Sequence, residues 1–247
     1  MILAHISDLH IGQDRGDGGA RALRRARDVV ERLNGIDGEL DGVLVTGDLA
    51  DHGLPEEYET VRELLAALRF PVATCPGNHD VRGAFRAGLL GETAADGPVN
   101  RVHRIGGYTI AMADSSIPGR NEGHLDDETL AWLDKTLTTD DPALVCFHHP
   151  PRELGIPFVD GIRLHEADGL AEVVLAHDNV VAVLCGHAHT GAVSTFAGRP
   201  LVVAPGVVST AVLPFESAEV LDYGLPPAVA FHVLDGDRGL VTHFRSL

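Results

Sequence analysis

The chain has 247 residues, of which 45% are hydrophobic and 22% charged, so it can bury the core of one large α/β domain or at most two small ones. Its formal net charge of −17 argues against a protein that binds nucleic-acid polymers, because such proteins usually carry a basic surface. The same charge would repel an anionic substrate unless a locally positive group attracts it.

Short apolar runs alternate with amphipathic segments along the chain. This alternation predicts a largely parallel sheet covered by helices, while the later strands, which have short connections, predict a more antiparallel second sheet. The strands are predicted near residues 2–7, 42–47, 71–75, 108–113, 143–148, 180–186, 200–204, 229–234 and 240–244, and the helices near 19–34, 55–68, 126–138 and 165–177.

The chain is predicted to form a single domain over residues 1–247, because no linker rich in Pro, Gly or Ser divides it. Residues 81–104 and 206–227 are expected to form loops or a small lid near a site. The opening residues do not resemble a signal peptide, and no apolar stretch reaches 18 residues. With three cysteines, which cannot all pair, the sequence predicts a cytoplasmic protein with reduced thiols and no membrane association.

Polar side chains that can bind metal ions follow five of the predicted strands. The carboxyl ends of the strands in an open α/β sheet form one edge, so these side chains are expected to converge. Glycines before three of the groups permit sharp bends and close approach. The groups are Asp8 and His10 in SDLH, Asp48 and Asp51 in GDLAD, Asn78, His79 and Asp80 in GNHD, His148 and His149 in HHPP, and His187 and His189 in GHAH.

Carboxylate, amide and imidazole donors together favour Mn²⁺, Fe or Zn²⁺ over Ca²⁺, and the lack of thiolate ligands argues against a structural zinc site. The donors are too many for one tetrahedral ion and suit two ions that share a carboxylate. Two divalent ions would bring four positive charges, whereas Asp8 and Asp48 bring only two negative charges. The ions would thereby attract a phosphate despite the acidic surface.

In this order the five groups of polar residues resemble the motifs of the calcineurin-like metallophosphoesterase superfamily, whose pattern runs DxH, GD, GNH[DE], H and GHxH. The match spans residues 8–189. The resemblance implies two mixed β-sheets flanked by helices in a four-layer αββα sandwich. It implies that one ion is held by Asp8, His10, Asp48 and His189, and the second by Asp48, Asn78, His148 and His187. The ligand in the HH pair is left open between His148 and His149, with His148 closer to the family pattern.

The resemblance also implies two catalytic residues that do not bind metal. His79 would donate a proton or a hydrogen bond to the phosphate or its leaving oxygen, and Asp51 would orient the imidazole of His79. The nucleophile implied is a hydroxide bound to the metal ions.

One departure from the superfamily narrows the substrate class. Protein Ser/Thr phosphatases carry GDxxDRG, in which the arginine holds a monoester dianion, whereas this chain reads GDLADHG with His52 at that position. The change favours a phosphodiester. The opening AHISDLH, the HHPP and the segment 113–133 are similar to the bacterial class III cyclic-nucleotide and glycerophosphodiester phosphodiesterases.

The sequence therefore predicts a dinuclear phosphodiesterase that acts on small diesters, with 3′,5′-cyclic nucleotides as the favoured substrates. Glycerophosphodiesters and nucleoside-diphosphate-linked diesters remain alternatives, as does phosphomonoesterase activity. A non-catalytic scaffold on the same fold is the alternative from a different class. The family also suggests a homodimer.

Overall fold

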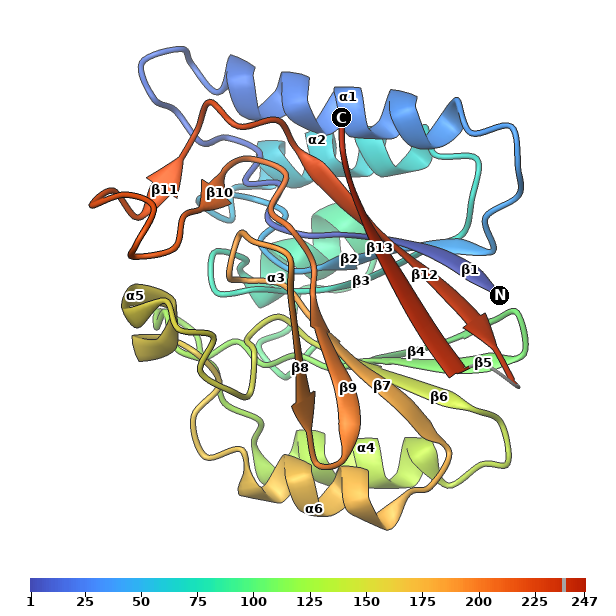
Figure 1. Ribbon diagram of the computed structural model, residues 1–247. Coiled ribbons are helices and arrows are strands. Elements are labelled where there is room, and N and C mark those ends of the chain that lie inside the picture. The colour runs from blue at the N-terminus through green and yellow to red at the C-terminus, as the bar shows by residue number, and fades with distance from the viewer. Residues whose placement is uncertain (237–238) are drawn as a thin grey trace.

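Two β-sheets pack face to face, with helices on the outer side of each (Figure 1). The computed structural model describes residues 1–236 and 239–247. The sheets have the strand orders β13-β12-β1-β2-β3 and β4-β5-β6-β7-β9-β8, and β10 and β11 form a separate pair. The strands are β1 (Ile2–Ile6), β2 (Gly42–Thr46), β3 (Val72–Cys75), β4 (Arg101–Ile105), β5 (Tyr108–Met112), β6 (Ala143–Cys146), β7 (Val180–Cys185), β8 (Ala192–Phe196), β9 (Arg199–Val203), β10 (Thr210–Ala211), β11 (Leu221–Asp222), β12 (Ala228–Asp235) and β13 (Gly239–Ser246).

Four main helices cover the sheets. In Figure 1, α1 and α2 lie over the first sheet and α4 and α6 lie over the second. These helices are α1 (Ala20–Asn34), α2 (Pro55–Ala66), α4 (Asp127–Leu137) and α6 (Asp168–Ala176); shorter ones are α3 (Arg82–Ala84), the π-helical turn η1 (Phe85–Leu90) and α5 (Pro157–Gly161). None of the helices in the described ranges is long and apolar enough to cross a membrane.

Three apolar layers hold the four structural layers together. One lies between the first sheet and its helices, where Val29 and Leu33 of α1 pack against the sheet. A second lies between the two sheets and includes Leu44 and Leu184, and a third lies under α4 and α6. The four-layer αββα sandwich is therefore confirmed.

The prediction of a more antiparallel second sheet is wrong. The late strands β12 and β13 pair antiparallel beside β1 in the first sheet, and the centre of the second sheet is parallel from β5 through β6 and β7 to β9. The strands β4 and β8 were not predicted. Both are edge strands with alternating exposure, so neither contains a continuous apolar run.

The parallel strands bring their carboxyl ends to one side of the sandwich. In the first sheet β1 pairs parallel with β2, and β2 with β3. Parallel bridging also joins Ser7 after β1 to Gly206 after β9, which connects the edges of the two sheets. All five donor groups named from the sequence follow strands that end here.

Candidate metal centre

Five predicted ligands adopt a backbone conformation that residues other than glycine rarely adopt. Of the seven non-glycine residues with positive φ in the described ranges, five are Asp8, His10, Asp48, His187 and His189, with φ between 45° and 66°. Each such residue costs on the order of 1 kcal/mol or more, and such strain concentrates at functional sites. The sheet edge therefore holds these side chains at a cost in stability.

Two glycines make the close approach of these segments possible. A Cβ at Gly47 would lie 2.4 Å from Nδ1 of His148, and a Cβ at Gly77 would lie 2.2 Å from Oδ1 of Asp48. Both distances are far below van der Waals contact. This confirms the close approach expected of the glycines before Asp48 and Asn78.

The first group of donors comes from β1 and β7. Nε2 of His10 lies 3.3 Å from Nε2 of His189, and the latter nitrogen lies 3.6 Å from Oδ1 of Asp8. The carboxylate of Asp48 approaches from β2, with Oδ2 3.4 Å from Nε2 of His10. Donor atoms of Asp8, His10 and His189 all lie within 4.8 Å of one another, close enough to share an ion.

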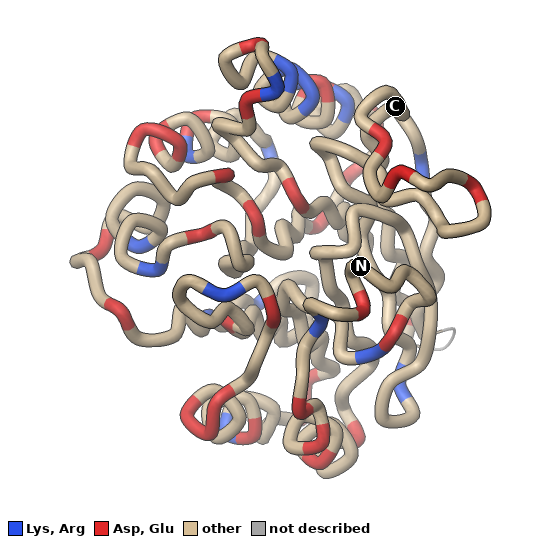
Figure 2. Tube along the Cα trace, turned by 90° about the vertical axis from the view of Figure 1, so that its left-hand side faces the viewer, with Lys and Arg blue, Asp and Glu red and all other residues tan. Residues whose placement is uncertain are grey.

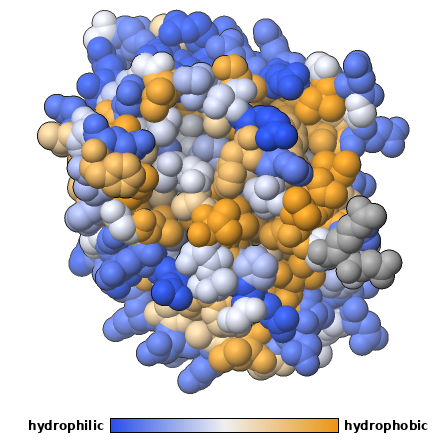
Figure 3. Space-filling model, viewed as in Figure 1, coloured by the Kyte–Doolittle hydropathy of each residue, from blue (hydrophilic) through white to orange (hydrophobic). Residues whose placement is uncertain are grey.

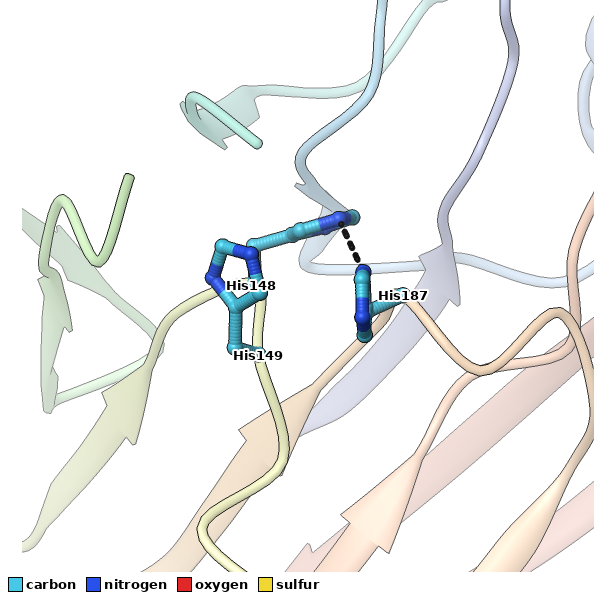
Figure 4. Close-up of side chains that lie close together, drawn as sticks. All are labelled: His148, His149 and His187. Atoms are coloured by element: carbon cyan, nitrogen blue, oxygen red, sulfur yellow. Dashed lines mark hydrogen bonds between the residues drawn. The ribbon is translucent and has the colours of Figure 1, made fainter. Parts of the chain in front are cut away.

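The second group centres on His148 and His187. Nε2 of His148 lies 3.1 Å from Nδ1 of His187, the contact drawn as a dashed line in Figure 4, and 3.3 Å from Oδ2 of Asp48. Oδ2 of Asp48 thus lies within 3.4 Å of a histidine nitrogen of each group. Asn78 follows β3 and lines the same pocket as Asp48.

Several buried polar atoms here have no hydrogen-bond partner among the described residues. They include both carboxylate oxygens of Asp8, whose side chain is fully buried, and Oδ1 of Asn78. A buried carboxylate without donors is unfavourable unless a cation compensates it. The donor set is therefore suited to divalent metal ions.

Protein partners fix the histidine rings so that their second nitrogens face the cluster. Nδ1 of His148 donates to the carbonyl oxygen of Thr46 at 2.7 Å, so Nε2 is the ring nitrogen that faces the cluster. Nδ1 of His10 contacts Oδ1 of Asp51 at 2.8 Å, and Nδ1 of His189 contacts Oγ of Ser209 at 2.8 Å. Such partners usually orient histidines that bind metal.

The electrostatics of the cluster favour a positive charge at its centre. Burial lowers the pKa of His148, but the charge and hydrogen bond of Asp48 outweigh burial and raise this pKa to about 9. Burial likewise raises the pKa of Asp48, yet His148 and His10 bring it well below its usual value. The carboxylates thus strongly favour a cation beside them.

The two adjacent histidines in HHPP have different surroundings. The side chain of His148 is fully buried and its Nε2 faces Asp48 and His187. Both ring nitrogens of His149 contact protein groups instead, Nδ1 with Oγ of Ser115 at 2.8 Å and Nε2 with the carbonyl oxygen of Asn121 at 3.2 Å. A ring nitrogen of His149 lies within 4.8 Å of ring nitrogens of His148 and His187, but of the two adjacent histidines only His148 has a ring nitrogen whose contacts are all with other donors of the cluster.

His79 lies beside the cluster with 39% of its side chain exposed. Its backbone N–H donates to Oδ1 of Asp48 at 2.9 Å, and Nδ1 of its ring donates to the backbone carbonyl oxygen of Asp51 at 2.8 Å. The carboxylate of Asp51 is 3.7 Å from that ring and instead hydrogen-bonds His10. Asp51 thus contacts His79 mainly through its peptide carbonyl, while its carboxylate lies nearer to His10 than to His79.

Asp80, which follows His79 in GNHD, holds the turn together. Its buried carboxylate accepts hydrogen bonds from the backbone N–H groups of Gly77, Leu49 and Ala50 and from the hydroxyl of Tyr58. Burial and the nearby charge of Asp48 raise the pKa of Asp80 to about 6. Asp80 thus connects the loops after β2 and β3, which carry Asp48 and Asn78.

A model of the calcineurin-like phosphoesterase family matches residues 1–191. The chain belongs to the calcineurin-like phosphoesterase family. It is 32% identical to a glycerophosphodiester phosphodiesterase of Enterobacter lignolyticus over 96% of the chain and 88% of that protein. It is 35% identical to a cAMP/cGMP dual specificity phosphodiesterase of Mycobacterium tuberculosis, over 85% of the chain and 68% of that protein.

The fold of this family is also found in solved structures of low sequence identity. The dimetal phosphatase from Danio rerio superposes with a TM-score of 0.73 at 18% identity, covering all of this chain and 96% of the other. This likeness supports the fold alone.

Over the donor cluster of this phosphoesterase lies a pocket of about 300 Å³ with two unlike sides. One side carries His10, Asp48, Asn78, His79, His187 and His189, and the other is built from Phe158 and Val159 of α5, Ile162, Ala211, Val220 and Leu221. Phe158 is 59% exposed, and in Figure 3 apolar side chains reach the surface on the left, where Figure 1 places α5 and β11.

Sequence reasoning missed this apolar side. The helix α5 has only five residues and begins at Pro157, and β11 has two residues, so neither contains a repeating pattern. Residues 206–227 were expected to lie near a site, which is confirmed for Ala211, Val220 and Leu221. Residues 81–104 contain α3, η1 and most of β4, and line a separate pocket through Val81, Arg82 and Gly83.

Proposed function

We propose that the protein is a phosphodiesterase whose centre holds two divalent metal ions that share Asp48. That it is a phosphoric diester hydrolase rests on its family and on relatives named as phosphodiesterases. The observation that carries the dinuclear proposal is the position of Oδ2 of Asp48, between Nε2 of His10 and Nε2 of His148.

Seven residues would hold the ions. One ion would bind Asp8, His10, Asp48 and His189, and the other would bind Asp48, Asn78, His148 and His187. The proximity of Asp8, His10 and His189, and the contacts of His148 with His187 and Asp48, support these two sets. Mn²⁺, Fe or Zn²⁺ suits this mixture of oxygen and imidazole donors. When bound, such ions neutralise phosphoryl oxygens and make a water-derived nucleophile available near neutral pH.

His79 would act at the leaving oxygen. Because its Nδ1 donates to the carbonyl of Asp51, the ring is fixed and its Nε2 is the atom available to a substrate in the pocket. With a second proton on Nε2, the ring would donate a hydrogen bond or that proton to the developing alkoxide and so stabilise it. Asp51 contributes through its carbonyl to His79 and through its carboxylate to His10.

Two features favour a diester over a monoester. His52, at the position where protein phosphatases have arginine, hydrogen-bonds Glu57 at 2.8 Å and is 55% exposed, outside the pocket lining. In addition, no Lys or Arg lines this pocket in the described ranges. A monoester dianion would lack the side-chain cation that usually holds its additional charge.

The apolar side of the pocket favours a substrate with a ring on the alcohol portion. Phe158, Val220 and Leu221 offer contact area to a nucleoside and little to glycerol. We therefore favour 3′,5′-cyclic nucleotides. Glycerophosphodiesters are the second candidate, because the relative from Enterobacter lignolyticus is named for them and is covered over 88% of its length.

The test is a parallel assay of the protein loaded with Mn²⁺, Fe²⁺ or Zn²⁺. The substrates are 3′,5′-cyclic AMP, 2′,3′-cyclic AMP, glycerophosphocholine, an aryl diester and its monoester. We expect metal-dependent turnover with kcat/KM highest for the 3′,5′-cyclic nucleotide. A preference for the monoester would contradict the diesterase proposal, and no metal-dependent turnover on any substrate would indicate a scaffold.

A further inference from the structure

The loop between β1 and α1 places Gln13 at the wall of the pocket over the metal centre. The backbone N–H of Gln13 donates to the carbonyl oxygen of His10 at 3.0 Å, which fixes the loop three residues after a metal ligand. Its side-chain Oε1 accepts a hydrogen bond from Nη2 of Arg21 at 2.9 Å.

The contact with Arg21 determines which end of the Gln13 amide is available. A guanidinium group has only N–H donors, so it must face the amide oxygen. The remaining polar group of Gln13 is its NH₂, for which the described residues provide no hydrogen-bond partner. Gln13, which lines the pocket, therefore carries two N–H donors that have no partner among the described residues.

Arg21 is itself held in place, so the orientation of Gln13 does not depend on one contact. Nη1 of Arg21 donates to the carbonyl oxygen of Val208 at 2.6 Å, and its guanidinium lies 4.8 Å from the ring centre of Tyr223. Arg21 belongs to α1, where the basic residues gather in Figure 2. Such preorganisation lowers the entropy lost when a ligand binds.

Gln13 lies between the two sides of the pocket. The loop joins it to His10 on the metal side, and Arg21 joins it to the segment that carries β10 and β11 on the apolar side. A diester that binds with its phosphoryl group at the metal centre would place its alcohol portion against Val220 and Leu221, within the same pocket as Gln13.

We propose that Gln13 determines specificity by donating a hydrogen bond from its NH₂ group to an acceptor on the alcohol portion of the substrate, with Arg21 as its positioning residue. The inference rests on the proposed phosphodiesterase function and identifies the substrate class further, as diesters of polyfunctional alcohols such as nucleosides. A site built to donate to an acceptor discriminates against analogues that lack it.

The test compares kcat/KM for 3′,5′-cyclic AMP with kcat/KM for diphenyl phosphate, whose rings carry no acceptor. In Gln13→Met, which keeps the length of the side chain, we expect the ratio of the two values to fall about tenfold, mainly through a higher KM for the nucleotide. Arg21→Met should lower the ratio of kcat/KM values by a smaller factor. The double variant Gln13→Met, Arg21→Met should lower this ratio no further than Gln13→Met alone.

Arg15→Ala is the matched control. Arg15 is exposed and stacks on the same Tyr223 ring at 3.8 Å, but the hydrogen bond to Oε1 of Gln13 comes from Arg21, so replacement of Arg15 should leave the ratio unchanged. Metal content and Tm of each variant show whether the centre and the fold are intact.

The outcomes separate the two proposals. If wild-type protein hydrolyses both diesters and Gln13→Met keeps the wild-type ratio, the role of Gln13 is wrong and the phosphodiesterase proposal stands. An equal loss on both substrates would place Gln13 at the phosphoryl group or in a structural role, which also overturns the inference. Wild-type protein that hydrolyses neither diester would overturn both.

Discussion

Oδ1 of Asp51 lies 2.8 Å from Nδ1 of His10 and 3.7 Å from Nδ1 of His79, whose hydrogen bond goes to the backbone carbonyl oxygen of Asp51 at 2.8 Å. One residue thus serves two histidines through different atoms. The side chain supports a proposed metal ligand, and the main chain supports the proposed acid. A substitution at this position can therefore affect one function and preserve the other.

We expect Asp51→Asn to weaken metal binding and to leave the action of His79 intact. Loss of the carboxylate partner of a histidine ligand usually costs 10–100-fold in metal affinity. Titration with Mn²⁺ should show this loss, and kcat should recover at saturating metal because the carbonyl of residue 51 still orients His79. A kcat that stays low at saturating metal would mean that the carboxylate acts on His79 after all.

Asp48→Ala and His79→Ala should separate metal binding from chemistry. Asp48 touches both donor groups, so Asp48→Ala should lose both ions and all activity. His79→Ala should keep its ions and lose about 10²–10⁴-fold in kcat, the usual contribution of a general acid. Metal content and kcat are measured on the same preparations; wild-type rates in both variants would refute the assignment.

Substitution of the HHPP histidines should identify the ligand of this pair. His148→Ala should bind one ion fewer per chain, because Nε2 of His148 faces Asp48 and His187. His149→Ala should keep the full complement and instead loosen the segment around Asn121 and Ser115, which His149 contacts. Elemental analysis of the two purified variants decides between them, and the reverse pattern would make His149 the ligand.

The parts of the fold that could be predicted from the sequence are those with a repeating pattern. The helix predicted at residues 19–34 is α1, Ala20–Asn34, because its apolar residues recur at helical spacing. The donor groups were readable because strand ends place short motifs at one edge. The interactions of Asp51, Gln13 and Arg25 were not readable, because they depend on which loops meet in space.

Arg25 illustrates this limit. In the sequence it is one of several arginines of α1, and its charge favours a solvent-exposed position, although its spacing from Ala22 and Val29 matches the buried face. In the structure it is 8% exposed and donates to the carbonyl oxygens of Val207, Tyr223 and Leu225. It thus anchors the segment that forms one side of the pocket, a role that no local pattern indicates.

A chain of buried hydrogen bonds in the first sheet predicts how stability depends on pH. Nδ1 of His5 lies 3.0 Å from Nε2 of His232, and the outer nitrogens contact the hydroxyls of Thr46 and Thr242 at 2.9 and 2.8 Å. Burial lowers the pKa of His232 to about 3. The pKa of His5 lies well below its usual value, mainly because of burial and additionally because His232 is close. Both rings are therefore neutral in the folded protein at neutral pH.

Because both folded pKa values lie below the unfolded value of about 6.5, the unfolded chain binds more protons as pH falls. The stability that this pair contributes is complete above about pH 6.5 and decreases below it, by up to about 1.4 kcal/mol per pH unit for each histidine. Urea unfolding of metal-loaded protein between pH 7.5 and 5 measures the slope. The double variant His5→Gln, His232→Gln should show a shallower decrease of stability with falling pH. The control His243→Gln, at an exposed position, should have the wild-type slope. Equal slopes in wild type and the double variant would show that these two histidines do not cause the loss of stability at acidic pH.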